Sequence, residues 1–352
     1  MSPRSKSHPM KLGGVFGLVH AMVDFVTVSV AFTVSRIYGI PFVYGLSVIV
    51  LYDIIAFAGQ AIIGFIVDRT RTYKTLVLLG IVLTALSVPL LSISPVAAAV
   101  CTAVGNACFH VGAGALSLRA IPGRAAVPGI FVAPGAIGLG LATMLGKSRI
   151  FFPWPLVLLM ILAFAAVLLL RVPGYEARVA DRRPIPKPYL ITALLLASVA
   201  IRALVGFGGS FNCSKTFSVK IALMTVAFLG KGLGGIICDR VGWVRGCMAA
   251  LLLSMPLIAF LGHLPVPLIA GFLLFQMTMP VTLVAVERIM PDRPGLAFGL
   301  CCLALVAGSL LAFSKDVQSL YSGWFFVALI SASAAMLYYS LKHLQKNLPT
   351  KF

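Results

Sequence analysis

The sequence is poor in acidic residues and in charge altogether. Only 9 of its 352 residues are Asp or Glu, against 28 Lys or Arg, and charged residues make up 11% of the chain. A soluble domain usually carries about 25% charged residues. Hydrophobic residues reach 60%, and the mean hydropathy is +1.05. These values exclude an ordinary soluble domain and predict a chain that crosses a membrane several times.

The motifs of several enzyme classes are also missing. The sequence has no Walker motif for a nucleotide, and no H-E-x-x-H or G-x-S-x-G motif for hydrolysis. Its seven cysteines form no C-x-x-C pair, and most lie in apolar runs, where cysteine behaves as a small hydrophobe. We therefore predict that the chain is not an enzyme and has no cofactor, metal site or disulfide.

The net charge of +19 is not gathered in a separate basic domain. Most Lys and Arg residues fall in the two tails and in alternate gaps between apolar runs, which is the positive-inside pattern. This pattern predicts a multi-pass protein of the cell's inner (plasma) membrane, with both termini in the cytoplasm. It favours the lipid bilayer, and not a nucleic acid, as the partner of the basic residues.

Apolar runs of about 20 residues can span a bilayer as helices. The sequence contains twelve such runs, which we place at 12–34, 42–66, 75–93, 95–118, 126–145, 151–171, 188–206, 218–238, 246–263, 265–288, 296–314 and 322–341. The longest gap, 172–187, is basic and Pro-rich, as expected of a cytoplasmic linker. The prediction is therefore an N-terminal six-helix half at 1–171 and a C-terminal six-helix half at 188–352.

A Gly-x-x-x-Asp-Arg motif closes both the second and the eighth run. The copies are Gly64, Asp68 and Arg69 and, 171 positions later, Gly235, Asp239 and Arg240. The glycine allows close helix approach, the carboxylate can bind a helix N-terminus, and the arginine can pair with a carboxylate or a lipid phosphate. Two copies half a chain apart favour a pair of gating latches on the cytoplasmic side. The alternative is a basic loop that only orients the chain.

These loops resemble the signature of the major facilitator superfamily between its second and third spans. The match covers Gly64 to Lys74 and, in the second half, Gly235 to Trp243. Pro134, Gly135 and Gly138 in the fifth run resemble the Gly/Pro-rich antiporter motif of that superfamily. The resemblance implies an all-α membrane fold of twelve helices in two pseudo-symmetric halves, in which proline bends the fifth span and small residues allow close packing.

Two stretches resemble the fosmidomycin-resistance branch of the superfamily. One runs from Gly105 to the Phe109-His110 pair, with Arg119 and Arg124 following it. The other comprises 280–287 and 290–300. The resemblance implies export of a drug or metabolite, in exchange for protons.

Ionisable side chains inside a span are costly and often functional. In the first half they are His20, Asp24, Asp53 and His110, our candidates for proton coupling. His20 and Asp24 are four residues apart and share a helix face, as do Asn106 and His110. The seven-residue spacing from Asp53 to Gln60 also predicts a shared face. For each residue the alternative is a structural hydrogen bond within the bundle.

The second half carries cations in its spans instead. The candidates for solute binding are Arg202, Lys231 and Gln276 there, together with Asn106 and Gln60 in the first half. Lys231 stands 171 positions after Gln60, which predicts pseudo-symmetric places. Two cations favour a solute with an anionic group. The alternative is that Arg202 and Lys231 extend to the two membrane surfaces.

The pattern as a whole predicts a secondary active transporter. It would move a small polar or amphipathic solute by alternating access, coupled to protons and in the direction of export, and it would act as a monomer. Uptake or uniport by the same fold stays open. A channel or a membrane receptor is the alternative of a different class, which the paired latches disfavour.

Overall fold

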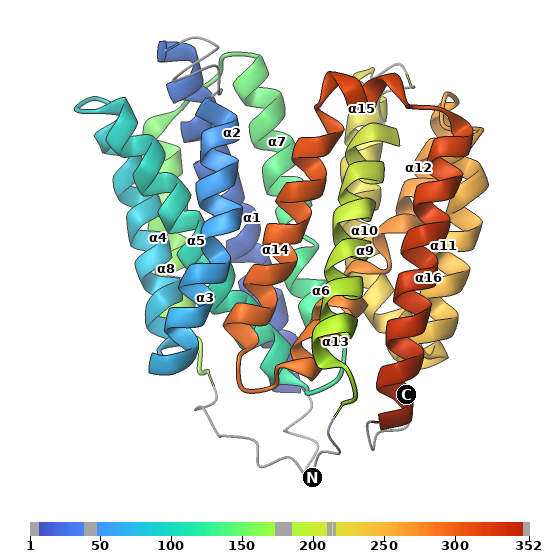
Figure 1. Cartoon of the computed structure of the whole chain (residues 1–352). Helices are drawn as coiled ribbons and strands as arrows, with labels where there is room; N and C mark the ends of the chain where they lie inside the picture. The colour runs from blue at the N-terminus through green and yellow to red at the C-terminus, as the bar shows by residue number, and fades with distance from the viewer. Residues whose placement is uncertain (1–6, 39–47, 173–184, 210–212, 214–215, 348–352) are drawn as a thin grey trace. The chain divides into compact units, whose positions relative to one another are not determined.

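The described part of the chain is helical. In a computed structural model, residues 7–38, 48–172, 185–209, 213 and 216–347 are described, and they form helices and short turns without a strand (Figure 1). Among them, ten helices are long and apolar enough to cross a membrane. Two shorter apolar helices, Pro153–Leu169 and Trp243–Ala259, lie at the predicted sixth and ninth spans. In lipid a helix satisfies its own backbone groups, which is why these runs are helical.

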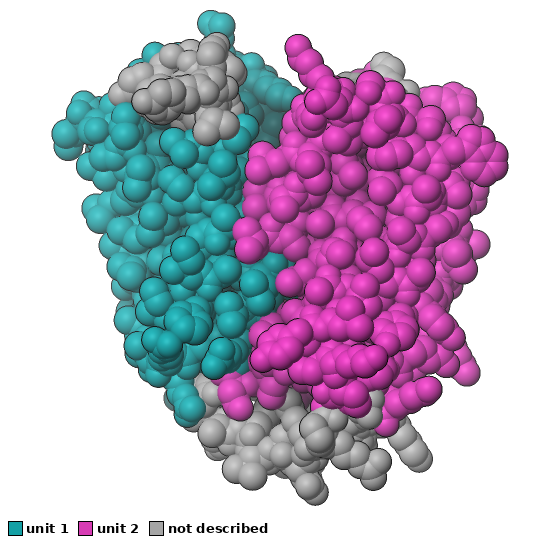
Figure 2. Space-filling model, viewed as in Figure 1, with its two compact units in different colours: residues 1–120, 134–175, 293–302 teal, residues 121–133, 176–292, 303–352 magenta. Residues whose placement is uncertain are grey.

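Two compact units divide the chain, coloured separately in Figure 2. Unit 1 comprises 1–120, 134–175 and 293–302. Its helices are α1 (Ser7–Tyr38), α2 (Val48–Asp53), the π-helix η2 (Ile54–Ala58), α3 (Gly59–Thr70), α4 (Tyr73–Leu90), α5 (Pro95–Ala120), α7 (Gly135–Lys147) and α8 (Pro153–Leu169), with the start of α14 (Pro294–Ala312). Within this unit α1 packs against both α5 and α7.

Unit 2 comprises 121–133, 176–292 and 303–352. Its helices are α6 (Ala126–Val132), α9 (Pro188–Gly208), α10 (Phe217–Val241), α11 (Trp243–Ala259), α12 (Pro265–Gln276), α13 (Met279–Ile289), the rest of α14, α15 (Lys315–Ser319) and α16 (Gly323–Asn347). Here α9 packs against α16, and α10 against α6 and α12.

Each unit includes one segment from the other half of the sequence. The first residues of α14 belong to unit 1, and α6 belongs to unit 2. The predicted linker, 172–187, lies largely outside the described residues. The two six-helix halves at 1–171 and 188–352 therefore stay a prediction.

Three predicted spans are interrupted. The fifth breaks between α6 and α7, where Pro134 has no amide hydrogen to continue the helix. The tenth breaks between α12 and α13, next to Pro280. The second changes at Asp53 from an α-helix to a π-helix. Such wide turns occur frequently at functional sites.

The π-helix corrects one prediction. Seven residues return to the same face of an α-helix, and on that basis we expected Asp53 and Gln60 to share a face. The wider π turns place about one extra residue between them, so Gln60 is rotated by roughly 100° from the expected position. Gln60 is fully buried, whereas Asp53 is only partly buried.

Candidate functional site: a buried histidine and aspartate cluster

Three of the predicted proton-coupling residues meet in unit 1. His20 Nε2 lies 3.1 Å from Asp24 Oδ2, as their four-residue spacing on α1 predicts. His110, on α5, places its Nε2 3.5 Å from Asp24 Oδ1 and 2.8 Å from His20 Nε2. All three side chains are largely buried, and Asp24 retains 15% exposure. We call His20, Asp24 and His110 the His-Asp cluster.

The position of the hydrogen atoms follows from the hydrogen bonds. His110 Nδ1 lies 2.9 Å from the carbonyl oxygen of Asn106, which can only accept, so Nδ1 carries a hydrogen. In the neutral ring Nε2 is then an acceptor, and it points toward His20 and Asp24. The 2.8 Å contact between the two Nε2 atoms therefore holds one hydrogen, which His20 donates.

A second proton would disrupt this arrangement. If both Nε2 atoms carried hydrogens, two donors would face each other at 2.8 Å. Each donor would then need one of the Asp24 oxygens as its acceptor, and these lie 3.1 Å from His20 Nε2 and 3.5 Å from His110 Nε2. The contact between the two rings therefore depends on how many protons the cluster holds.

A hydrogen-bond network extends the cluster along α1. Asn106 Nδ2 donates to Asp24 Oδ1 at 3.2 Å and to Thr27 Oγ1 at 3.1 Å. Thr27 Oγ1 also accepts from the Tyr52 hydroxyl, at 3.0 Å. Asn106 therefore orients the carboxylate, and Tyr52 connects the cluster to the second span.

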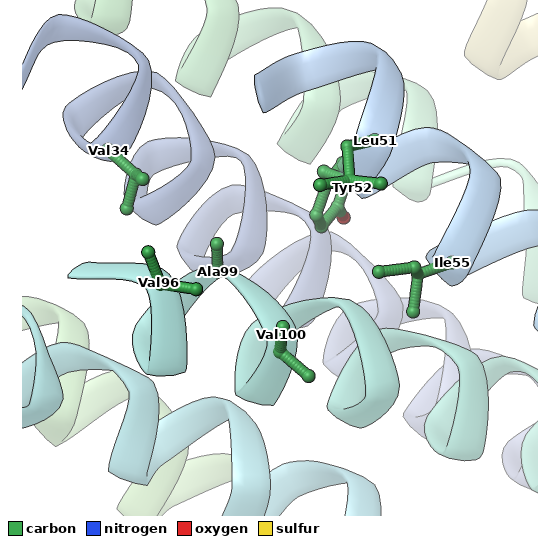
Figure 3. Close-up of a pocket in the computed structure, with 7 residues that line it drawn as sticks. All are labelled: Val34, Leu51, Tyr52, Ile55, Val96, Ala99 and Val100. Carbon is green, nitrogen blue, oxygen red and sulfur yellow. The ribbon is translucent and has the colours of Figure 1, made fainter. Parts of the chain in front are cut away.

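Tyr52 also lines a small pocket. The pocket is apolar, and its walls come from α1, α2, η2 and α5 (Figure 3). Its lining residues are Val34, Leu51, Tyr52, Ile55, Val96, Ala99 and Val100. The space is far smaller than a solute site, so it is a gap in the packing of these helices.

The predicted Gly/Pro motif of the fifth span packs against the cluster. A side chain at Gly135 would overlap the His20 ring and would lie 2.8 Å from Asp24 Oδ2. Gly138, one turn further along α7, faces the backbone of Ala21. The break at Pro134 and these two glycines let the α7 backbone lie directly on the cluster face of α1.

Of the candidates for solute binding in unit 2, Arg202 has the most fully described surroundings. Arg202 is buried; it donates to Thr278 and Thr282 Oγ1, the latter at 2.7 Å, and to the carbonyl oxygen of Ser198 at 3.1 Å. These bonds hold the Arg202 guanidinium among the helices of unit 2. Lys231 and Gln276 are partly buried. Of the two first-half candidates, Asn106 belongs to the cluster network, and Gln60 Nε2 donates to the carbonyl oxygen of Ala56.

The two Gly-x-x-x-Asp-Arg motifs bind helix N-termini. Asp68 accepts hydrogen bonds from the amides of Gly295 and Leu296 at the start of α14, both at 2.8 Å. The Tyr73 hydroxyl donates to the same carboxylate at 2.9 Å. The first amides of a helix have no partner within it, so Asp68 caps α14. Gly64 lies against this backbone, where a side chain would overlap Gly295.

The second copy repeats this arrangement in unit 2. Asp239 accepts from the amides of Ala125 and Ala126 at the start of α6, both at 2.9 Å. Trp243 Nε1 supplies a third donor at 2.9 Å, and Gly235 lies against the Ala125 backbone. Arg69 and Arg240 are exposed, and Arg69 lies over the Phe65 ring. Both expected bonds from aspartate to a helix N-terminus are thus present, whereas gating stays a prediction.

Sequence reasoning missed several partners. Thr27, Thr278 and Thr282 carry no signal of their own, because threonine is common in membrane helices. Tyr73 and Trp243 offered a weak signal, since each is an aromatic hydrogen-bond donor four or five residues after a motif aspartate. The sequence also suggested no metal site, yet His20, Asp24 and His110 each offer a ligand atom within 4.8 Å of the others.

The chain was compared with known proteins by sequence and by structure. No protein-family profile matches it, and no curated protein matches it by sequence. By structure it is similar to FucP, a major facilitator superfamily transporter in the outward conformation, with TM-score 0.68 and 12% identity over 93% of this chain and 97% of that one.

Two further solved structures agree. The human organic anion transporter MFSD10 (TETRAN) gives TM-score 0.68 at 15% identity, covering 98% of this chain and all of its own. A bacterial homologue of the iron transporter ferroportin, in an outward-facing state, gives TM-score 0.64 at 13% sequence identity. The match covers 96% of this chain and 98% of the homologue. At identities this low, the likeness to these structures shows the fold alone. It extends over nearly the whole chain. The chain is a multi-pass helical membrane protein with the fold of the major facilitator superfamily.

Proposed function

We propose that the protein is a secondary active transporter that couples movement of a small solute to protons through the His-Asp cluster. The observation that carries the proposal is the 2.8 Å contact between His20 Nε2 and His110 Nε2 beside Asp24. This buried contact is stable with one bridging proton and unstable with two. A proton bound or released there therefore changes the packing of α1 on α5, which is what coupling to a conformational cycle requires.

The cycle itself is alternating access, in which the two aspartate caps act as cytoplasmic latches. Asp68 joins α3 to α14, and Asp239 joins α10 to α6, so each latch links the two halves of the sequence. Breaking a latch costs charge-assisted hydrogen bonds, and the helix N-terminus would then need water as a partner. This role is supported by the same geometry recurring at two positions 171 residues apart.

An amphipathic solute with an anionic group suits the site residues best. Arg202 is a buried positive charge whose described hydroxyl partners, Thr278 and Thr282, are neutral. An anionic group could displace one of these hydroxyls and form a stronger, charge-assisted bond. The structurally similar proteins include one described as an organic anion transporter and one described as a fucose:proton symporter, which agrees with an anionic solute and with proton coupling.

The proposal also covers the direction of transport, the membrane in which the protein acts and its oligomeric state. The resemblance to the fosmidomycin-resistance branch favours export across the inner membrane, and the basic loops favour cytoplasmic termini. A monomer suffices for this fold. Uptake and uniport are the competing functions. A vesicle assay that records solute and proton movement together separates them from proton-coupled export.

Proton movement in proteoliposomes tests the proposal. Vesicles would contain a pH-sensitive dye, and small organic anions and phosphonates would be added outside to the wild type, Asp24→Asn and His110→Ala. We expect at least one solute to move protons in the wild type, and each substitution to abolish that movement, because either one removes a member of the cluster. The sign of the pH change relative to solute movement distinguishes antiport from symport.

Matched substitutions outside the cluster provide the controls. Asp316→Asn and His263→Ala remove the same two residue types from exposed positions in unit 2, and both should leave proton movement unchanged. Solute movement without protons, or proton movement that persists in both cluster variants, would show that the coupling assignment is wrong. The chain would then be a uniporter, or its coupling residue would lie elsewhere.

A further inference from the structure

We propose that His20, Asp24 and His110 bind one divalent transition-metal ion of the Zn²⁺, Co²⁺ or Fe²⁺ class. This inference concerns a ligand of the cluster and does not depend on transport. Two imidazole nitrogens and one carboxylate suit these borderline ions, whereas Ca²⁺ and Mg²⁺ prefer oxygen ligands alone.

The distances between the ligand atoms fit such an ion. Metal bonds of about 2.0–2.1 Å in a tetrahedral site place neighbouring ligand atoms about 3.3 Å apart. The two Nε2 atoms lie 2.8 Å apart, and each faces a different oxygen of Asp24: His20 Nε2 is 3.1 Å from Oδ2, and His110 Nε2 is 3.5 Å from Oδ1. Each distance differs from the ideal by about half an ångström or less. Small rotations of the rings, together with a carboxylate that turns one oxygen toward the ion or binds it through both, would form the site.

The surroundings already hold the ligands as a metal site requires. A histidine that binds a metal commonly donates its other ring hydrogen to a carbonyl, and His110 Nδ1 does so to Asn106. The Asp24 carboxylate is in turn oriented by the Asn106 amide. These bonds present His110 Nε2 and Asp24 to the same point without a further change of tautomer at His110.

The ion would replace the bridging hydrogen. That hydrogen is bonded to His20 Nε2 and points toward the lone pair of His110 Nε2, and an Asp24 oxygen lies 3.1 Å from the same His20 nitrogen. When the ion binds, the neutral His20 ring changes tautomer: its hydrogen moves from Nε2 to Nδ1, and the Nε2 lone pair binds the metal. Gly135 adds no side chain to this site; one there would lie 2.8 Å from Asp24 Oδ2 and closer still to His20.

Calorimetric titration of the full-length, untagged protein in detergent with Zn²⁺ tests the proposal. We expect one ion per chain, with affinity reduced at least about tenfold in each of His20→Gln, Asp24→Asn and His110→Gln. That bound is set by the 10- to 100-fold losses seen when only the partners of metal ligands are removed. His263→Gln removes an exposed histidine outside the cluster and should bind Zn²⁺ like the wild type.

X-ray absorption spectroscopy of the Zn²⁺-loaded wild type gives a second measurement that needs no variant. It should show scattering from two imidazole rings. Absence of binding to the wild type, binding unchanged in both histidine variants, or a spectrum without imidazole would each overturn the proposal. Since none of these readouts involves a solute, a negative result here leaves the transport proposal standing, and failure of the vesicle assay leaves this one standing.

Discussion

The Asp68 cap allows a quantitative test of the latch. Asp68→Asn preserves the size of the side chain but replaces one of its two acceptor oxygens by an NH2 group, which can only donate. In the wild type both oxygens are used, one by the amide of Gly295 and the other by that of Leu296. One of these amides therefore loses its partner and faces another donor.

The cost follows from the kind of bond that is lost. A hydrogen bond to a charged group contributes about 1.5–3 kcal/mol net. The free energy that holds the start of α14 against Asp68 should fall by that amount, which corresponds to about a 10- to 150-fold larger open population. The Tyr73 hydroxyl can still donate to the remaining oxygen, so the latch is weakened without being removed.

Hydrogen exchange followed by mass spectrometry measures this population. The amides of Gly295 and Leu296 should exchange faster in Asp68→Asn by roughly the same factor, because local opening controls their protection. The amides of Ala125 and Ala126, which Asp239 caps, provide an internal control and should not change.

The second copy reverses the experiment. Asp239→Asn should accelerate exchange at Ala125 and Ala126 and leave the start of α14 unchanged. If exchange at Gly295 and Leu296 does not change in Asp68→Asn, the carboxylate does not hold this helix end. If hydrogen exchange becomes faster by the same factor at both helix ends in either variant, the substitution destabilises the whole protein and the latch reasoning is refuted.

Three further substitutions test the packing of the site, each by thermal unfolding in detergent. Gly64→Ala should lower stability by about 1–3 kcal/mol, because its side chain would overlap the α14 backbone, whereas Gly59→Ala, with nothing within 4 Å, should be neutral or stabilising. If the two behave alike, close approach at Gly64 does not matter. Tyr52→Phe should cost about 0.5–1.5 kcal/mol in the wild type and much less in a Thr27→Val background, since the two hydroxyls share one hydrogen bond; equal costs would exclude that coupling. Arg202→Lys keeps the charge but cannot reach two threonine hydroxyls at once, so it should cost about 1.5–3 kcal/mol, and an unchanged unfolding temperature would contradict this.

The sequence by itself determined the class of protein and the positions of its helices. Composition and run length were sufficient because a chain in lipid must satisfy its backbone groups within each segment. The repeat at a 171-residue offset also identified Asp68 and Asp239 as ligands of a helix end. Contacts along one helix, such as that of His20 with Asp24, followed from the 3.6-residue period.

Only the tertiary structure decided which helices meet and with which faces. His20 and His110 are 90 residues apart, and Asp68 and Gly295 are 227 residues apart. Such pairs depend on how each helix is rotated and how closely neighbours approach, which small residues such as Gly64 and Gly135 control through packing. The π-helix after Asp53 shows the same limit within one span, because a single wide turn changed the face of Gln60 without leaving a mark in the spacing. Local sequence sets the spacing at which residues return to one face of a helix, whereas packing against its neighbours sets how the helix is rotated about its axis.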